Sequence, residues 1–174
     1  MSETSQARQR LARYCVGDGL DLGYGGDPVV PSAITMDGLL GPYGEGVGKA
    51  PQNLHGDARD LRWFKDGVMD YVYSSHLLED FDAVEIPRVL REWLRVLKPG
   101  GLLVLLLPEQ RRYVEYCRAR GAEPNPAHRV ADFGLMWLKD VLVHHFWGKV
   151  RVVKELAESG PYSFELVLEK ERES

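Results

Sequence analysis

The sequence of 174 residues contains little cysteine, no long apolar run and no excess of positive charge. Its two cysteines, Cys15 and Cys117, are isolated and form no CxxC pair, which argues against a disulfide framework and against a zinc site. The longest purely apolar run, residues 102–107, is far too short to span a bilayer. We therefore expect a soluble, cytoplasmic protein that does not act in a membrane.

The charge balance is slightly acidic. The chain carries 26 acidic and 22 basic residues, a formal net charge of −4, and these residues are interspersed along the sequence. Because nucleic-acid-binding proteins carry a basic patch or stripe, the sequence predicts neither DNA nor RNA as a partner. The length fits one domain over residues 1–174, large enough to bury roughly two-thirds of its unfolded surface.

The most informative stretch is DGLDLGYGGDP, residues 18–28. A short apolar strand there runs into Gly23 and Gly25, as expected where the backbone turns sharply and lies close to a ligand. A second apolar run ends at Asp37, and Gly38 follows it. An acid at a strand tip beside a glycine loop is well placed to bind a ribose diol. Together the two segments predict a site for a nucleoside cofactor.

The segment after these glycines departs from the usual nucleotide-binding pattern. Pro28 and Pro31 bracket only two valines, so at most one helical turn fits, with Asp27 as its N-cap and Pro28 at the first helical position. Pro28 also stands where the G-x-G-x-x-G motif of nicotinamide dehydrogenases has its third glycine, which disfavours that class.

Apolar periodicity and turn residues divide the rest of the chain into alternating strands and helices. This alternation predicts an α/β fold with a doubly wound, mostly parallel sheet of seven strands and a shortened helix after the first strand. The last two strands form a hairpin, so the final strand is antiparallel. Strands are predicted over residues 20–23, 33–37, 53–58, 70–76, 102–107, 150–156 and 163–169, and helices over residues 5–16, 82–97, 112–120 and 132–146.

Two further segments connect these elements. Residues 59–64 can form a turn or two of helix, capped by Asp57 or Asp60. Residues 38–48 contain five glycines and no apolar period, which predicts a mobile loop that acts either as a connector or as a lid over a bound ligand.

Four segments in this order resemble a known family: LDLGYG at residues 20–25, ITMD at 34–37, YVYSSHLLE at 71–79 and VLKPGGLL at 96–103. They are similar to the glycine motif, the ribose-binding strand end, the S-x-H-V-L-E-H segment and the L-K-P-G-G-x-L segment of the class I S-adenosylmethionine-dependent methyltransferases, in the small-molecule, type 11-like branch. The resemblance covers about residues 10–170. It implies a Rossmann-like fold and the transfer of a methyl group from S-adenosylmethionine to an oxygen, nitrogen or carbon atom of a small-molecule acceptor.

The resemblance also implies roles for individual residues. The backbone of the glycine motif would contact the methionine and ribose portions, Asp37 would accept hydrogen bonds from the ribose hydroxyls, and Asp57 would accept one from the adenine amino group. Simple turn-forming or capping roles are the alternatives for Asp21, Asp37 and Asp57. The expected cofactor-binding residues are Asp21, Gly23, Tyr24, Gly25, Asp37, Gly38, Asp57, Ala58, Ser74 and Ser75.

His76 is the candidate catalytic residue. An imidazole with a pKa near neutrality can act as the base that a hydroxyl acceptor requires, and a purely structural hydrogen-bonding role is the alternative. No convincing cluster of carboxylates and imidazoles lies at one strand end, so no metal is expected. The short glycine motif leaves a second function open, that of a non-catalytic, degenerate methyltransferase-like binding protein or partner subunit.

Overall fold

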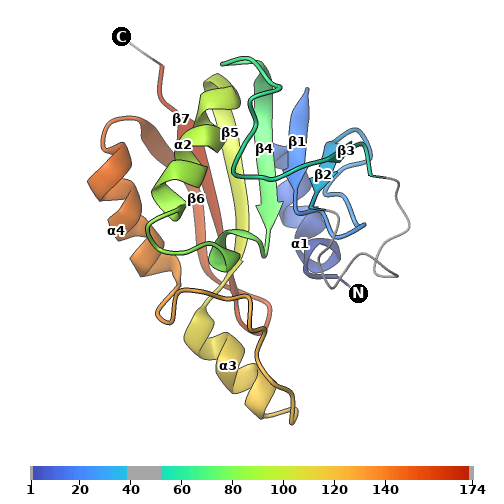
Figure 1. The fold of residues 1–174 in the computed structure, drawn as a ribbon, viewed down its shortest axis with the longest axis vertical. Coiled ribbons are helices and arrows are strands. Elements are labelled where there is room, and N and C mark those ends of the chain that lie inside the picture. The colour runs from blue at the N-terminus through green and yellow to red at the C-terminus, as the bar shows by residue number, and fades with distance from the viewer. Residues whose placement is uncertain (1, 39–51, 173–174) are drawn as a thin grey trace.

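The computed structural model describes residues 2–38 and 52–172 (Figure 1). Its strands are β1 (Gly19–Leu22), β2 (Ile34–Asp37), β3 (Leu54–His55), β4 (Met69–Ser75), β5 (Leu97–Pro108), β6 (Val150–Ser159) and β7 (Ser163–Lys170). Its helices are α1 (Glu3–Leu11), α2 (Ile86–Val96), α3 (Gln110–Arg118) and α4 (Leu135–Phe146), with short 3-10 helices η1 (Ala12–Tyr14) and η2 (Leu78–Asp80). The predicted glycine-rich loop lies outside the described residues from residue 39 onward.

The seven strands form one sheet in the order β3-β2-β1-β4-β5-β7-β6. β1 pairs in parallel with β2 and with β4, and β4 pairs in parallel with β5. β7 is antiparallel to both of its neighbours, β5 and β6. The predicted fold class is therefore confirmed, including the antiparallel last strand.

Helices cover both faces of the sheet (Figure 1). Along β5, Leu103 and Leu105 pack on the face that α2 and α4 cover, whereas Val104 and Leu106 pack on the opposite face with α1. Side chains of a strand alternate between faces, so a strand that is covered on both sides must be apolar at every position. This requirement explains the continuous apolar run that predicted β5.

No helix forms between β1 and β2, so the predicted helical turn capped by Asp27 is wrong. The Asp27 carboxylate instead accepts hydrogen bonds from the hydroxyls of Ser2 and Ser5, at the N-terminus of α1, and forms an ion pair with Arg8. Burial raises the pKa of Asp27, but these hydrogen bonds and the Arg8 charge outweigh burial and lower it. The carboxylate is therefore used to attach α1 to the loop.

The predicted helix over residues 59–64 is also wrong. The carboxylates of Asp57 and Asp60 accept hydrogen bonds from the backbone N–H groups two residues later, at Arg59 (2.9 Å) and Arg62 (3.2 Å). Such local bonds compete with helix formation and favour turns. The segment accordingly consists of two successive turns.

The structure also describes both cysteines and all four α-helices. Cys15 and Cys117 are both buried free thiols, and burial raises the pKa of Cys15, which makes its thiolate scarce. None of the helices in residues 2–38 and 52–172 combines the length and apolar character needed to cross a membrane.

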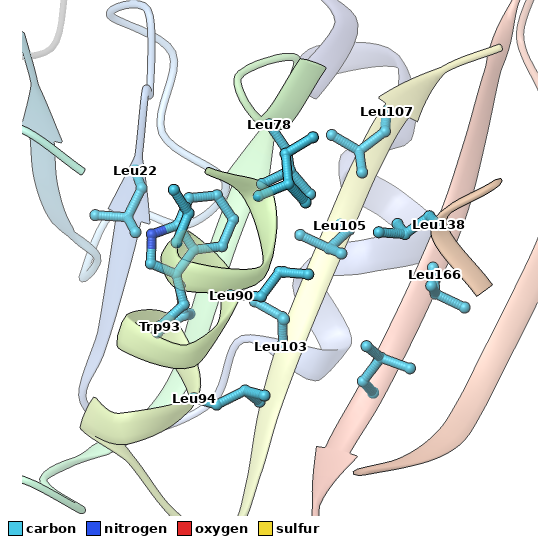
Figure 2. Close-up of a cluster of buried hydrophobic side chains, with 14 of the residues drawn as sticks. Leu22, Leu78, Leu90, Trp93, Leu94, Leu103, Leu105, Leu107, Leu138 and Leu166 are labelled. Carbon is cyan, nitrogen blue, oxygen red and sulfur yellow. The ribbon is translucent and has the colours of Figure 1, made fainter. Parts of the chain in front are cut away.

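Trp93 of α2 lies at the centre of the larger core, beside Leu22 and Leu90 (Figure 2). It is fully buried, and its indole N–H donates a hydrogen bond to the carbonyl of Ala58, at 2.8 Å. The core of the α2 face therefore also holds the backbone that follows β3.

We expect Trp93→Phe to lower the free energy of unfolding by about 1–3 kcal/mol, because the Ala58 carbonyl loses its donor. Urea denaturation monitored by circular dichroism measures this change. Trp63→Phe is the matched control, since Trp63 is 61% exposed, and should change stability by no more than about 0.5 kcal/mol. Equal effects of the two substitutions would contradict the role of Trp93.

Candidate functional site

A cleft of about 780 Å³ opens where β1, β2 and β3 end. In open α/β sheets ligands bind at the carboxyl ends of the strands, next to the point where the strand order reverses, and here that point lies between β1 and β4. Gly23, Asp37, Gly38, Asp57 and Ala58 are the predicted cofactor residues that line it. The other lining residues are Met36, His55, Gly56, Arg59, Leu77 and Phe81.

The two glycines of the turn after β1, Gly23 and Gly25, let the backbone lie close to neighbouring groups. Gly23 and Gly25 have φ angles of 69° and 55°, a region that residues with a Cβ rarely adopt. A Cβ on Gly23 would lie 3.0 Å from Cδ2 of Leu77, so only glycine lets the turn after β1 pack against the segment after β4.

Asp37 connects this turn to the second strand. Its Oδ2 accepts a hydrogen bond from the backbone N–H of Gly25, at 3.2 Å, and the half-buried side chain lines the cleft. Its Oδ1 accepts no hydrogen bond from any described residue. One carboxylate oxygen thus orders the glycine turn, while the other is available to a ligand.

Asp21 does not line the cleft. Its side chain is completely buried, and Oδ2 accepts a hydrogen bond from the backbone N–H of Val29, at 2.7 Å. Among the described residues nothing bonds to its Oδ1. Burial, reinforced by the charges of Asp27 and Asp37, raises the pKa of Asp21 to about 7, against the lowering effects of Val29 and Arg8. Asp21 therefore supports the loop after the glycine turn through its hydrogen bond with Val29.

Asp57 lines the cleft, but its carboxylate is bound by Arg59. The guanidinium donates from Nε to Oδ1, at 3.0 Å, and from Nη2 to Oδ2, at 2.7 Å. This bidentate contact is the main reason that the pKa of Asp57 is lowered. A ligand amino group would have to share the carboxylate with Arg59. Ala58, the next residue, is held by Trp93 as described above.

Three other predicted cofactor residues do not line the cleft: Tyr24, Ser74 and Ser75. Ser74 is fully buried, and its hydroxyl donates to the carbonyl of Leu22, at 3.0 Å, which links β4 to β1. Ser75 and Tyr24 are only 8% and 9% exposed. Of the three, the hydroxyl of Ser74 supports a strand end.

His76 follows β4 and is the only non-glycine residue with a positive φ, 51°, in the described part of the chain. Its Nε2 lies 3.1 Å from Oγ of Ser163, and its Nδ1 lies 3.4 Å from Oε1 of Glu79. The ring packs edge-on against Tyr162. No set of three or more His, Cys, Asp or Glu side chains within the described ranges is arranged to hold a metal ion.

The sequence reasoning missed the apolar wall of the cleft, which includes Leu77 and Phe81. The signal was available, because residues just past the end of a parallel strand lie at the same edge of the sheet as the ligand. Arg59 was missed as the partner of Asp57.

A second cleft, of about 720 Å³, lies beside α2. It is lined mainly by charged side chains that pair with one another, including Arg59 with Glu85 and Arg62 with Asp60.

The buried Asp21 gives stability a specific pH dependence. The carboxyl ionises near 3.8 in an unfolded chain and near 7 in the folded protein. Since the folded protein keeps the proton to higher pH, the contribution of Asp21 to stability falls as pH rises from about 4 to about 7.

We therefore expect the stability of Asp21→Asn, relative to that of the unsubstituted protein, to rise with pH. Between about pH 5 and about pH 8 this stability difference should grow by about 2 kcal/mol. Urea unfolding at the two pH values measures the difference. Asp18→Asn is the control, because Asp18 is exposed in the same segment. A stability difference that does not change with pH for Asp21→Asn would show that this carboxyl is ionised in the fold.

Comparison with known proteins agrees with this geometry. The family described as "Methyltransferase domain" matches residues 43–105. A search of curated proteins finds no match. The crystal structure of a protein from Pyrococcus horikoshii is 20% identical, with alignment over 96% of this chain and 89% of that chain and a TM-score of 0.69.

Two further structures have the same fold. A SAM-dependent methyltransferase from Archaeoglobus fulgidus is 16% identical over 96% of this chain and 94% of that one, with a TM-score of 0.66. The 1,6-didemethyltoxoflavin-N1-methyltransferase of Burkholderia thailandensis is 13% identical over 98% of this chain and 79% of that one, with a TM-score of 0.67. The predicted resemblance is confirmed to this extent: residues 43–105 are similar to the methyltransferase domain family, and the chain shares its fold with solved S-adenosylmethionine-dependent methyltransferases.

Proposed function

We propose that the protein is an enzyme that transfers a methyl group from S-adenosylmethionine to a small-molecule acceptor. The observation that carries this proposal is the carboxylate of Asp37, at the tip of β2, which lines the cleft while its Oδ2 accepts a hydrogen bond from the glycine turn. The Burkholderia thailandensis enzyme, similar in fold, was crystallised with a small substrate and S-adenosylhomocysteine, which supports both the cofactor and the class of acceptor.

The residues of the cleft fit this cofactor. Asp37 can accept hydrogen bonds from the two ribose hydroxyls, because its Oδ1 has no other partner among the described residues. Met36, Leu77 and Phe81 supply apolar surface for a flat base, and the backbone at Ala58 meets the edge of that base. The volume of about 780 Å³ lies within the range of small-molecule sites, about 300–1,000 Å³.

S-adenosylmethionine supplies a methyl group on a positively charged sulfur. The contribution of the protein is to place the acceptor in line with that methyl group and to exclude water. The glycine turn allows the backbone to approach the ligand, and Asp57 and Arg59 also line the cleft. The net charge of −4 favours a small acceptor over a nucleic acid.

Calorimetric titration with S-adenosylhomocysteine tests the proposal. We expect micromolar binding by the unsubstituted protein and about a hundredfold weaker binding by Asp37→Ala, because two hydrogen bonds to a charged acceptor contribute about 1.5 kcal/mol each. Asp132→Ala is the matched control, since its side chain is 70% exposed and, among the described residues, pairs only with Arg111 on the surface. The control should bind like the unsubstituted protein.

Asp37→Asn separates the two tasks of this residue. An asparagine oxygen can still accept from the N–H of Gly25 but carries no charge, so the glycine turn keeps its partner while ribose binding weakens. No binding of S-adenosylhomocysteine by the unsubstituted protein would overturn the proposed function and favour the non-catalytic alternative.

A further inference from the structure

A cleft of about 450 Å³ lies at the end of the sheet opposite the candidate cofactor site. It is bordered by Lys170, the last residue of β7, and by the turn that joins α4 to β6. Because β7 is antiparallel to β5, its last residue lies toward the start of β5, whereas the cofactor cleft opens where β1, β2 and β3 end (Figure 1). The two clefts therefore lie at opposite ends of the parallel strands.

The floor of this cleft is apolar. Leu94 of α2 and Phe146 of α4 line it, and both side chains are buried. Both belong to the larger hydrophobic cluster, so they are held in place by the close packing of the core. The alkyl stems of lysine and arginine side chains can extend such a surface while their charged ends reach solvent. A ligand with an apolar body can therefore be in contact with the core here.

The rim of the cleft carries an excess of positive charge. One carboxylate, that of Glu171, lines it together with five cationic side chains: Arg91, Arg95, Lys149, Lys170 and Arg172. The whole chain has a net charge of −4, so this excess is local. A cleft that is lined mainly by charges of one sign concentrates the electrostatic potential and attracts ligands of the opposite sign.

Arg95 and Lys170 have structural roles that account for their charge. Arg95 pairs with Glu92, at 2.8 Å, and with Asp66, at 2.6 Å. The ammonium group of Lys170 donates a hydrogen bond to the carbonyl of Leu97, at 2.7 Å, directly after the end of α2. Cations near a helix C-terminus are stabilised by the helix dipole, so the fold alone explains these two side chains.

Arg91, Lys149 and Arg172 have no such role. Their side chains form no hydrogen bond and no ion pair with any residue in the ranges 2–38 and 52–172. Arg91 precedes the last turn of α2, so the helix dipole does not explain its position. The backbone of the other two is fixed, because the N–H of Glu171 donates to the carbonyl of Lys149, at 2.9 Å, and the N–H of Lys149 donates to the carbonyl of Phe146, at 2.9 Å.

We propose that this cleft binds a small organic anion with an apolar body, for which octyl phosphate is the probe. The anionic group pairs with Arg91, Lys149 and Arg172 at the rim, and the apolar body lies on Leu94 and Phe146. Guanidinium and ammonium groups form strong, charge-assisted hydrogen bonds with phosphate and carboxylate oxygens. The volume of about 450 Å³ lies within the range of small-molecule sites, about 300–1,000 Å³. The inference does not rest on the proposed methyltransferase function.

Calorimetric titration of the full chain tests both halves of the site. We expect octyl phosphate, at concentrations below those at which it forms micelles, to bind at least about tenfold more tightly than inorganic phosphate or octan-1-ol. In the series butyl, hexyl and octyl phosphate, affinity should rise about twofold or more with each added methylene, because the chain lies on the apolar floor. Equal affinities along this series would overturn the inference.

Charge reversal locates the site. We expect Lys149→Glu and Arg172→Glu each to weaken the binding of octyl phosphate at least about tenfold, because each removes a cation and adds a repelling charge. Arg88→Glu is the matched control, since Arg88 is also exposed on α2 but does not line this cleft. It should change the affinity by no more than about twofold. All three positions are exposed, and circular dichroism verifies that each variant is folded.

An equal loss of affinity in all three variants, or no loss in Lys149→Glu and Arg172→Glu, would overturn the inference. Saturating S-adenosylhomocysteine should leave the affinity for octyl phosphate unchanged, and competition would place the probe in the cofactor cleft instead. If the protein does not bind S-adenosylhomocysteine, the proposed function fails while the charge-reversal result still decides this inference. Binding to phosphatidylglycerol vesicles without binding of monomeric octyl phosphate would show that the positive charge serves a lipid surface, which would also overturn it.

Discussion

The candidate site depends on one hydrogen bond, from the backbone of Val29 to the buried carboxylate of Asp21. Many nucleotide-binding folds support the glycine turn with a long helix whose N-terminus follows it. Here Pro28 and Pro31 prevent such a helix, and the loop returns directly to β2. Asp21 ties this loop to the sheet from below, and Asp27 ties it to α1 from the side. Two acidic side chains therefore support the loop in place of a helix. Oδ1 of Asp21, which has no hydrogen-bond partner among the described residues, is the energetic cost of that arrangement.

The other side of the cleft is supported by the core. Trp93 packs among leucines of the α2 face and at the same time binds the backbone of Ala58 (Figure 2). β3 is only two residues long, so the sheet alone gives little support to the segment that follows it. A single indole thus connects the large hydrophobic cluster to the edge of the cleft, and the rigidity of α2 determines how precisely Ala58 and Asp57 are placed.

Features that depend on neighbouring residues could be predicted from the sequence, and features that depend on distant partners could not. The alternation of apolar strands and helices predicted the sheet, and Gly23, Asp37 and Ala58 were correctly expected at one edge of it. The helix over residues 59–64 was wrong because Asp57 and Asp60 bind the backbone locally. Ser74 was expected near the ligand, but its hydroxyl points back to β1, and nothing in a fully buried strand distinguishes its two faces. The cleft that Arg91 and Lys149 line together could not be foreseen, since the two lie far apart in the sequence.

The attachment of α1 to the glycine turn has a practical consequence for handling the protein. Ser2 caps α1 and also donates to Asp27, so the amino end of the described chain lies beside the loop that follows Gly23 and Gly25. The carboxyl end of β7 lies at the opposite end of the sheet from the amino end of α1 (Figure 1). An affinity tag or fusion partner joined at the amino end would crowd the glycine turn, whereas one joined at the carboxyl end would extend away from it. Ligand-binding measurements are therefore best made on protein that carries its affinity tag at the carboxyl end.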